Sequence, residues 1–175
     1  YSLPGACGIS VLAKGPVISY TGDGSFMLNL QELQTVARNQ FNIKIVIINN
    51  NGYSGVRYGQ KGHLRGKTIG TDPSNGLDLP DYEKIAAAFG LPYCKAENTG
   101  RIDAAMEEIF RSEGPVICEV MCDPEQFELH NALVNYGKRK FGFRPMEDQS
   151  PFIDRETFFR EMIVKPMEES YGTPV

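Results

Sequence analysis

Residues 16–58, PVISYTGDGSFMLNLQELQTVARNQFNIKIVIINNNGYSGVRY, decide the fold of this chain. The short apolar run at 17–20 predicts one strand, and the run at 43–48, rich in β-branched residues, predicts a second. Between them, apolar residues recur at helical spacing and predict a helix over 25–39. A strand–helix–strand unit of this length has parallel strands and a right-handed crossover. The polar turns that end the two strands therefore lie at one edge of a sheet, where open α/β sheets bind ligands.

The first of these turns combines groups that bind an anion with one that repels it. Gly22 and Gly24 allow the backbone to approach a ligand closely and to adopt positive φ. The amides of Gly24 and Ser25 face outward at the start of the predicted helix, where the helix dipole favours an anion. The Asp23 carboxylate would repel a phosphate unless a cation lay between the two. The turn therefore predicts a phosphate bound together with a metal ion.

The second turn supplies neutral oxygen atoms, from the side chain of Asn50 and the backbone carbonyl of Gly52. With the Asp23 carboxylate they form a set of hard oxygen ligands of the kind that Mg²⁺ prefers. The two turns together predict a metal–diphosphate clamp, with Asp23, Asn50 and Gly52 as metal ligands.

The pair of turns also resembles a known motif. GDG at 22–24, followed by NN at 49–50, is similar to the thiamine diphosphate motif, and the 27 positions from Asp23 to Asn50 suit that family. The similarity continues through 51–56, and most of the chain resembles the diphosphate-binding domain of acetolactate synthase-like enzymes. The resemblance implies thiamine diphosphate and Mg²⁺ as cofactors. It places the cofactor-binding residues on both turns: Gly22, Asp23, Gly24, Ser25, Asn50, Gly52 and Tyr53.

Two other phosphate-binding motifs do not fit. The chain has no G-x-x-x-x-G-K-[ST]. In the dinucleotide motif G-x-G-x-x-G, Met27 would replace the third glycine. The second strand also ends in Asn rather than in an acid that would hold a ribose. An NAD-binding domain is therefore the weakest of the alternatives.

Composition and charge restrict the class of protein. The chain has 175 residues, 41% of them hydrophobic and 23% charged, enough for one domain with a hydrophobic core. The net charge is −4 with no basic block, so neither nucleic acid nor an acidic membrane surface is expected as a partner. No apolar run reaches membrane-spanning length.

The cysteines indicate a reducing compartment. Cys7, Cys94, Cys118 and Cys122 form no C-x-x-C motif, and the two histidines do not complete a zinc set. We expect buried free thiols and a cytoplasmic protein. Because the chain begins with Tyr1 and shows no signal peptide, we interpret it as a domain of a longer protein.

The rest of the chain alternates helices and strands, which predicts an α/β fold: a doubly wound, mainly parallel sheet with helices on both faces. We divide the chain into a thiamine diphosphate-binding domain, 1–124, and a C-terminal tail, 125–175, that packs on this domain or on a partner subunit. The further elements expected in the domain are helices at 3–14, 53–60, 81–89 and 101–112 and strands at 92–95 and 116–121.

In the tail we expect a solvated charge cluster at 138–140 and an extended segment at 144–151. A helix capped by Asp154 and ended by Pro166 should follow.

The glycine-rich stretch 52–76 is expected to be mainly loop. Loops of this length in compact domains are usually functional or disordered. It carries four basic residues: Arg57, Lys61, Arg65 and Lys67. Three roles remain open, namely a basic lid over an anionic substrate, a subunit contact, and a solvated loop. His63 is expected to be solvated rather than catalytic.

The resemblance implies an enzyme of the lyase or transferase class. Such enzymes decarboxylate a 2-keto acid and ligate the carbanion to an acceptor, and the cofactor carries the electron flow. In the family a Glu protonates the cofactor from a pyrimidine-binding domain, usually of another subunit, and no residue here matches it. We therefore assign no catalytic residue, and expect a homo-oligomer and no turnover by the isolated chain. Whether FAD binds a domain outside this chain is left open.

Three positions after the second turn form the predicted substrate pocket: Gly55, Val56 and Gly59. Val56 stands where pyruvate decarboxylase-like enzymes carry a Glu, which favours carboligation. Gly55 and Gly59 stand where acetolactate synthases usually carry Met and Trp, which predicts an acceptor bulkier than pyruvate. Two alternatives remain: a non-catalytic module that binds Mg–thiamine diphosphate, and a related 2-keto acid decarboxylase.

Overall fold

The chain forms two compact units, Tyr1–Gln126 and Phe127–Val175. The computed structural model describes residues 1–126, 133–135, 141–149 and 152–171. None of the helices within these ranges is both long enough and apolar enough to cross a bilayer. The predicted division after residue 124 and the packing of the tail stay predictions.

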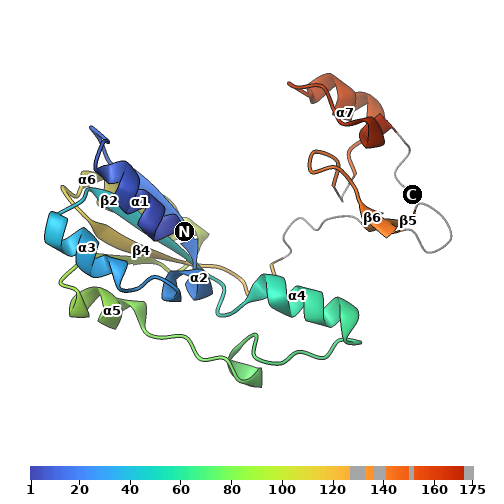
Figure 1. Cartoon of the computed structure of the whole chain (residues 1–175). Coiled ribbons are helices and arrows are strands. Elements are labelled where there is room, and N and C mark those ends of the chain that lie inside the picture. The colour runs from blue at the N-terminus through green and yellow to red at the C-terminus, as the bar shows by residue number, and fades with distance from the viewer. Residues whose placement is uncertain (127–132, 136–140, 150–151, 172–175) are drawn as a thin grey trace. The chain divides into compact units, whose positions relative to one another are not determined.

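A four-stranded sheet forms the centre of the first unit (Figure 1). Its strands are β1 (Val17–Gly22), β2 (Ile43–Asn49), β3 (Tyr93–Ala96) and β4 (Val116–Met121). They lie in the order β1-β2-β4-β3, and every neighbouring pair is parallel. This arrangement confirms the predicted α/β fold with a parallel sheet.

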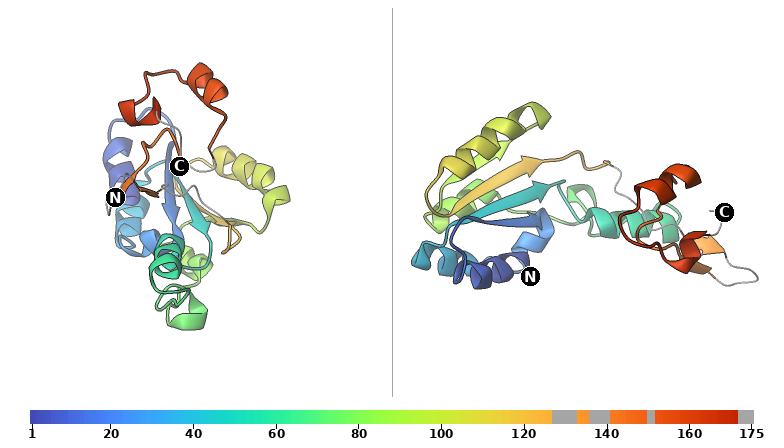
Figure 2. Two further views of the ribbon diagram at one scale, coloured as in Figure 1. Left: turned by 90° about the vertical axis from the view of Figure 1, so that its right-hand side faces the viewer. Right: turned by 90° about the horizontal axis from the view of Figure 1, so that it is seen from above.

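Helices cover both faces of the sheet. α1 (Ser2–Ser10), α3 (Glu32–Asn39) and α5 (Tyr82–Ala88) contribute to one hydrophobic cluster, and α6 (Ile102–Arg111) contributes to a second. The view from above shows α6 on the opposite side of the sheet from α1 (Figure 2). Side chains of β2 enter both clusters, which explains why this strand is an unbroken apolar run rather than an alternating one.

The prediction of one continuous helix over 25–39 was wrong. α2 (Asp23–Met27) starts directly at the end of β1, and α3 begins only after an interval. Across 28–34 the backbone hydrogen bonds join residues three apart, a tighter winding than that of an α-helix. This break accompanies the burial of both Phe26 on α2 and Leu33 on α3.

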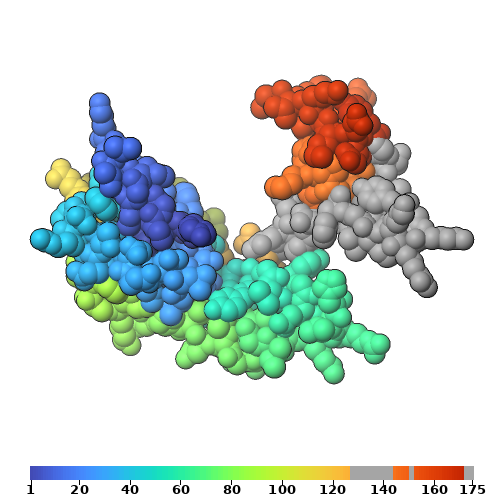
Figure 3. Space-filling view, in the orientation of Figure 1, coloured from blue at the N-terminus to red at the C-terminus, as the bar shows by residue number. Residues whose placement is uncertain are grey.

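The stretch 52–76 is helical over much of its length, contrary to the expected loop. The short helix predicted at 53–60 is present and extends further, as α4 (Ser54–His63). The segment after it closes with a 3₁₀ helix, Pro73–Asn75, whose first turn is capped by Asp72. In the space-filling view, α4 and the residues after it form an arm that extends from the body of the first unit (Figure 3).

The other predicted elements of the first unit are present with shifted ends. α1 stops at Ser10 rather than at Lys14, and a 3₁₀ helix, Thr99–Arg101, precedes α6. All four cysteines are free; three are buried, as predicted, and Cys122 is half-buried.

The second unit contains short elements. They are the antiparallel strands β5 (Leu133–Asn135) and β6 (Phe141–Phe143), then α7 (Arg155–Glu161) and a 3₁₀ helix, Glu168–Tyr171. α7 begins as predicted, because the Asp154 carboxylate accepts a hydrogen bond from Thr157 N at 2.9 Å. It ends before Pro166, which therefore does not terminate it. The predicted charge cluster at 138–140 lies outside the described residues.

The segment expected to be extended at 144–151 is a turn over its described part. Asp148 N donates a hydrogen bond to Pro145 O at 2.9 Å, which closes the turn. The buried Asp148 carboxylate pairs with Arg144 and, at 2.8 Å, with Arg155. A carboxylate that leaves water needs such partners, and they favour the turn over an extended chain.

Candidate functional site

The two polar turns lie side by side at the carboxyl ends of β1 and β2. The strands are neighbours, and Gly22 pairs with Ile48 at their ends. The Asp23 carboxylate joins the two turns, because its Oδ2 accepts a hydrogen bond from Gly52 N at 3.0 Å. Two of the three residues predicted as metal ligands are thus in direct contact.

Asp23 is a buried carboxylate that accepts hydrogen bonds from two backbone amides. Asp23 is 3% exposed, and its Oδ1 accepts a hydrogen bond from Gly24 N at 2.6 Å. Within the described part of the chain it makes no ion pair. Burial, and then the nearby Asp23 charge, raise the pKa of Tyr82, whose hydroxyl donates to the Asp23 backbone carbonyl at 3.0 Å. A buried negative charge is unfavourable unless it is compensated, so this position favours a cation.

The turn after β2 leaves one amide oxygen without a partner. Asn49 Oδ1 accepts a hydrogen bond from Asn51 N at 2.8 Å, and Asn51 has a positive φ of 57°. Asn50 is the residue between these two. Its Oδ1 atom is buried and accepts no hydrogen bond from any described residue. Buried polar atoms in native proteins nearly always have a partner. An unpartnered oxygen in the turn that Asp23 contacts through Gly52 N is therefore a candidate metal ligand.

Gly52 is the residue that this turn requires. Its φ is 152°, a conformation that L side chains rarely adopt, and a Cβ added here would lie 2.2 Å from Thr71 O. The same carbonyl accepts a hydrogen bond from Tyr53 N at 2.8 Å. The segment before the 3₁₀ helix thus presses against the turn and fixes it.

The roles expected for the glycines of the first turn need correction. Gly22 has a φ of −75°, and neither Gly22 nor Gly24 adopts positive φ. Gly24 packs against Tyr53 instead: a Cβ there would lie 2.0 Å from the ring of this exposed side chain, which would have to move. Its amide donates to Asp23, so it does not simply face outward for an anion. The amide of the exposed Ser25 and the cofactor contact of Tyr53 stay predictions.

The predicted substrate-pocket residues lie on α4. Gly55 and Val56 are exposed and Gly59 is half-buried. A Cβ added at Gly55 or Gly59 would meet nothing within 4 Å, so both glycines leave space where larger side chains would fit. Their assignment to a substrate pocket stays a prediction.

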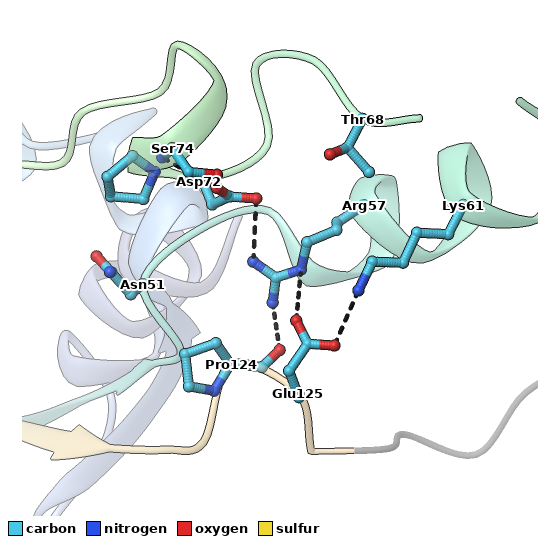
Figure 4. A pocket seen from close by; sticks show the side chains of 9 residues that line it. Asn51, Arg57, Lys61, Thr68, Asp72, Ser74, Pro124 and Glu125 are labelled. Atoms are coloured by element: carbon cyan, nitrogen blue, oxygen red, sulfur yellow. Dashed lines mark hydrogen bonds and ion pairs between the residues drawn. The ribbon is translucent and has the colours of Figure 1, made fainter. Parts of the chain in front are cut away.

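Arg57 lines a pocket of about 460 Å³ beside α4 (Figure 4). The sequence analysis placed it among four basic residues of the stretch 52–76 and left the role of that stretch open. Arg57 is 5% exposed; Nη2 donates to Pro124 O, and the guanidinium pairs with Asp72 at 3.7 Å and Glu125 at 4.0 Å. Lys61 pairs with Glu125 at 2.8 Å. These contacts anchor α4 to the Asp72 turn and to the segment that follows β4. The sequence held no local signal for this, because a basic residue in a glycine-rich stretch is usually solvated.

A second missed residue is Glu119 on β4. It is 5% exposed, its Oε1 accepts a hydrogen bond from Asn49 Nδ2 at 2.5 Å, and its Oε2 accepts one from Tyr93 OH. Burial and this hydrogen bond raise the pKa of Tyr93. The available signal was a single charged residue within the apolar strand predicted at 116–121.

The chemistry of the candidate ligands suits a hard cation. Across the described ranges, no three His, Cys, Asp or Glu side chains gather in a way that would hold a metal. The set of Asp23, Asn50 and Gly52 instead mixes a carboxylate with amide and carbonyl oxygens. Mg²⁺ binds proteins through few carboxylates and completes its octahedron with phosphate oxygens and water.

Comparison with known proteins matches most of the first unit to one family. Residues 1–120 match the family model described as thiamine pyrophosphate enzyme, C-terminal TPP binding domain. The chain is 34% identical over 124 residues to acetolactate synthase isozyme 2 large subunit of Escherichia coli K12, covering 70% of this chain and 22% of that protein. It is 34% identical over 123 residues to acetolactate synthase large subunit of Porphyra purpurea, covering 69% of this chain and 20% of the relative.

A solved structure shows the same fold. The thiamine diphosphate-dependent 4-hydroxybenzoylformate decarboxylase of Rhodococcus jostii RHA1 superposes with a TM-score of 0.61 at 25% identity, covering 70% of this chain and 23% of the other. The chain spans about a fifth of the length of the curated relatives that it matches. The chain belongs to the family of C-terminal thiamine pyrophosphate-binding domains of thiamine pyrophosphate enzymes.

Proposed function

We propose that this chain binds the diphosphate end of thiamine diphosphate through a Mg²⁺ ion held by Asp23, Asn50 and the Gly52 carbonyl. The wider activity that we propose is decarboxylation of a 2-keto acid followed by ligation to an acceptor, as the acetolactate synthase relatives suggest. A pyrimidine-binding domain of the same or another subunit would complete the site.

One observation carries the metal site. The buried Asn50 oxygen has no hydrogen-bond partner among the described residues, and it belongs to the turn whose Gly52 amide is held by Asp23. A Mg²⁺ ion would give this oxygen a partner and would compensate the buried carboxylate at once. The residues present therefore fit the metal.

The chain's own residues bind and orient. Asp23 keeps the two turns together through Gly52 N and would bring negative charge to the metal. Thr71 O, against Gly52, keeps the turn in the conformation that only glycine adopts easily. When bound, thiamine diphosphate supplies the carbanion-stabilising chemistry, and the protein supplies position and electrostatics.

The glycines on α4 support a roomy acceptor site. Gly55 and Gly59 leave open space on the helix that follows the metal turn. We propose an acceptor bulkier than pyruvate. A full-length enzyme that made acetolactate efficiently and refused larger acceptors would contradict this.

Calorimetry on the 175-residue chain tests the metal site. Thiamine diphosphate should bind in the presence of Mg²⁺ and not in its absence. Asp23→Asn should lose this Mg²⁺-dependent binding. Asp103→Asn is the matched control, because Asp103 is an exposed carboxylate in the first turn of α6. Binding of equal strength in EDTA, or an unchanged response in Asp23→Asn, would refute the proposed site.

A second measurement concerns the division of labour. The purified chain should show no steady-state decarboxylation of pyruvate, because none of its residues matches the acid that the family draws from another domain. Turnover by the chain alone would overturn this assignment. A full-length protein that binds Mg–thiamine diphosphate but shows no decarboxylation or ligation would favour the non-catalytic module.

A further inference from the structure

Glu119 occupies an unusual position for a carboxylate. The rest of β4 is apolar, and its residues Val116, Ile117, Cys118 and Val120 are buried in the two hydrophobic clusters. Placing a charge there costs more than an apolar residue of similar size unless every oxygen is paired. The carboxylate is paired: Oε1 with Asn49, Oε2 with Tyr93 and, at 3.8 Å, with Lys95.

The contact with Asn49 fixes the orientation of an amide. An ionised carboxylate only accepts hydrogen bonds, so Asn49 must point its NH₂ group at Glu119. Its Oδ1 is then directed to the other side, where it accepts from Asn51 N at 2.8 Å. A reversed amide would place a donor against the Asn51 donor. Glu119 thereby selects the side-chain orientation that closes the turn containing Asn50.

We propose that Glu119 is a positioning residue of the metal site, acting through Asn49 on the turn that presents Asn50. This inference rests on the proposed function of that turn. Groups that hydrogen-bond to metal ligands, or that hold the ligands in place, typically change metal affinity by roughly 10- to 100-fold when they are removed. Glu119 lies one step further out, because it holds the neighbour of a ligand.

The test measures the Mg²⁺ concentration that gives half-maximal binding of thiamine diphosphate to the 175-residue chain, by calorimetry. Glu119→Met keeps the length and apolar packing but removes the acceptor, and should raise this concentration about ten-fold. Glu119→Gln can still accept from Asn49 and should restore binding to near the wild-type value. Thermal unfolding without metal or cofactor records the stability of each variant.

Tyr93→Phe is the matched control. It removes the other hydrogen bond of the Glu119 carboxylate and leaves the Asn49 contact in place. A purely structural role for Glu119 predicts that Glu119→Met and Tyr93→Phe shift the Mg²⁺ requirement in proportion to their loss of stability. A positioning role predicts a shift in Glu119→Met and its absence in Tyr93→Phe.

Two further outcomes keep the inference separate from the proposed function. Wild-type chain that fails to bind Mg–thiamine diphosphate overturns both, whereas wild-type binding with an unchanged Glu119→Met overturns this inference alone. If Glu119→Met does not fold, Asn49→Ala takes its place, since it removes the same turn contact while Glu119 keeps Tyr93 and Lys95. An unchanged Mg²⁺ requirement in folded Asn49→Ala would then overturn the proposal.

Discussion

Replacing Gly52 by alanine should destabilise the chain even without metal or cofactor. The new Cβ would lie 2.2 Å from Thr71 O, far inside van der Waals contact, and the residue has a φ of 152°. Holding a non-glycine residue in such a conformation costs about 1–3 kcal/mol. Moving Thr71 O away weakens its hydrogen bond from Tyr53 N, which is worth about 0.5–1.5 kcal/mol. The expected loss in the free energy of unfolding is therefore about 1.5–4.5 kcal/mol.

The matched control is the same substitution seven residues later. Gly59 lies within α4, without positive φ, and a Cβ there would meet nothing within 4 Å. Gly59→Ala should stabilise the chain by about 0.5–1 kcal/mol, because alanine is the better helix former. Urea unfolding followed by circular dichroism, without Mg²⁺ or cofactor, measures both variants. A Gly52→Ala chain as stable as wild type, or two variants shifted in the same direction, would refute the reasoning.

Two further predictions concern other parts of the first unit. Arg57→Met should lower the free energy of unfolding by about 1–3 kcal/mol, because it removes a buried cation that donates to Pro124 O. Lys61→Met breaks a more exposed ion pair and should lower the free energy of unfolding by less than about 1 kcal/mol. Equal losses in urea unfolding would contradict this difference. The pKa of Asp81 is lowered by the hydrogen bond from Lys84 N that caps α5, so its contribution is full above the ordinary pKa of 3.8 and is lost as the pH falls below it. Asp81→Asn should flatten the acid limb of the stability curve, and an unchanged limb would rule out this role.

The fold was predictable because its signals are local. The β-branched run of β2 and the apolar spacing on α3 each lie within one element, and alternation of strands and helices along the chain fixes the class. The break between α2 and α3 was not predictable, because the apolar stripe runs across it. α4 was predicted too short, since Gly55, Gly59 and Gly62 are poor helix formers. Its anchoring by Arg57 depends on residues more than a dozen positions away.

The candidate site divides in the same way. Two short motifs contain Asp23, Asn50 and Gly52, and their chemistry can be recognised from the sequence. Thr71 and Glu119, which hold the second turn, come from segments that no local pattern links to it. A lone acid in an apolar strand is a usable signal, whereas a backbone carbonyl such as that of Thr71 leaves none.

Strand order explains how these supports converge. β2 lies between β1 and β4, so the turn at its carboxyl end has a neighbour on each side. From the β1 side Asp23 reaches Gly52, and from the β4 side Glu119 reaches Asn49. The chain passes from β2 over the position of β4 to β3 and then returns to β4, so the strand order changes direction after β3. Sheets of this kind bind ligands near such a change of direction. An edge strand has only one such neighbour. The turn that we propose to hold the metal follows β2, a strand with two neighbours, so that Asp23 from one side and Glu119 from the other can act on the same few residues.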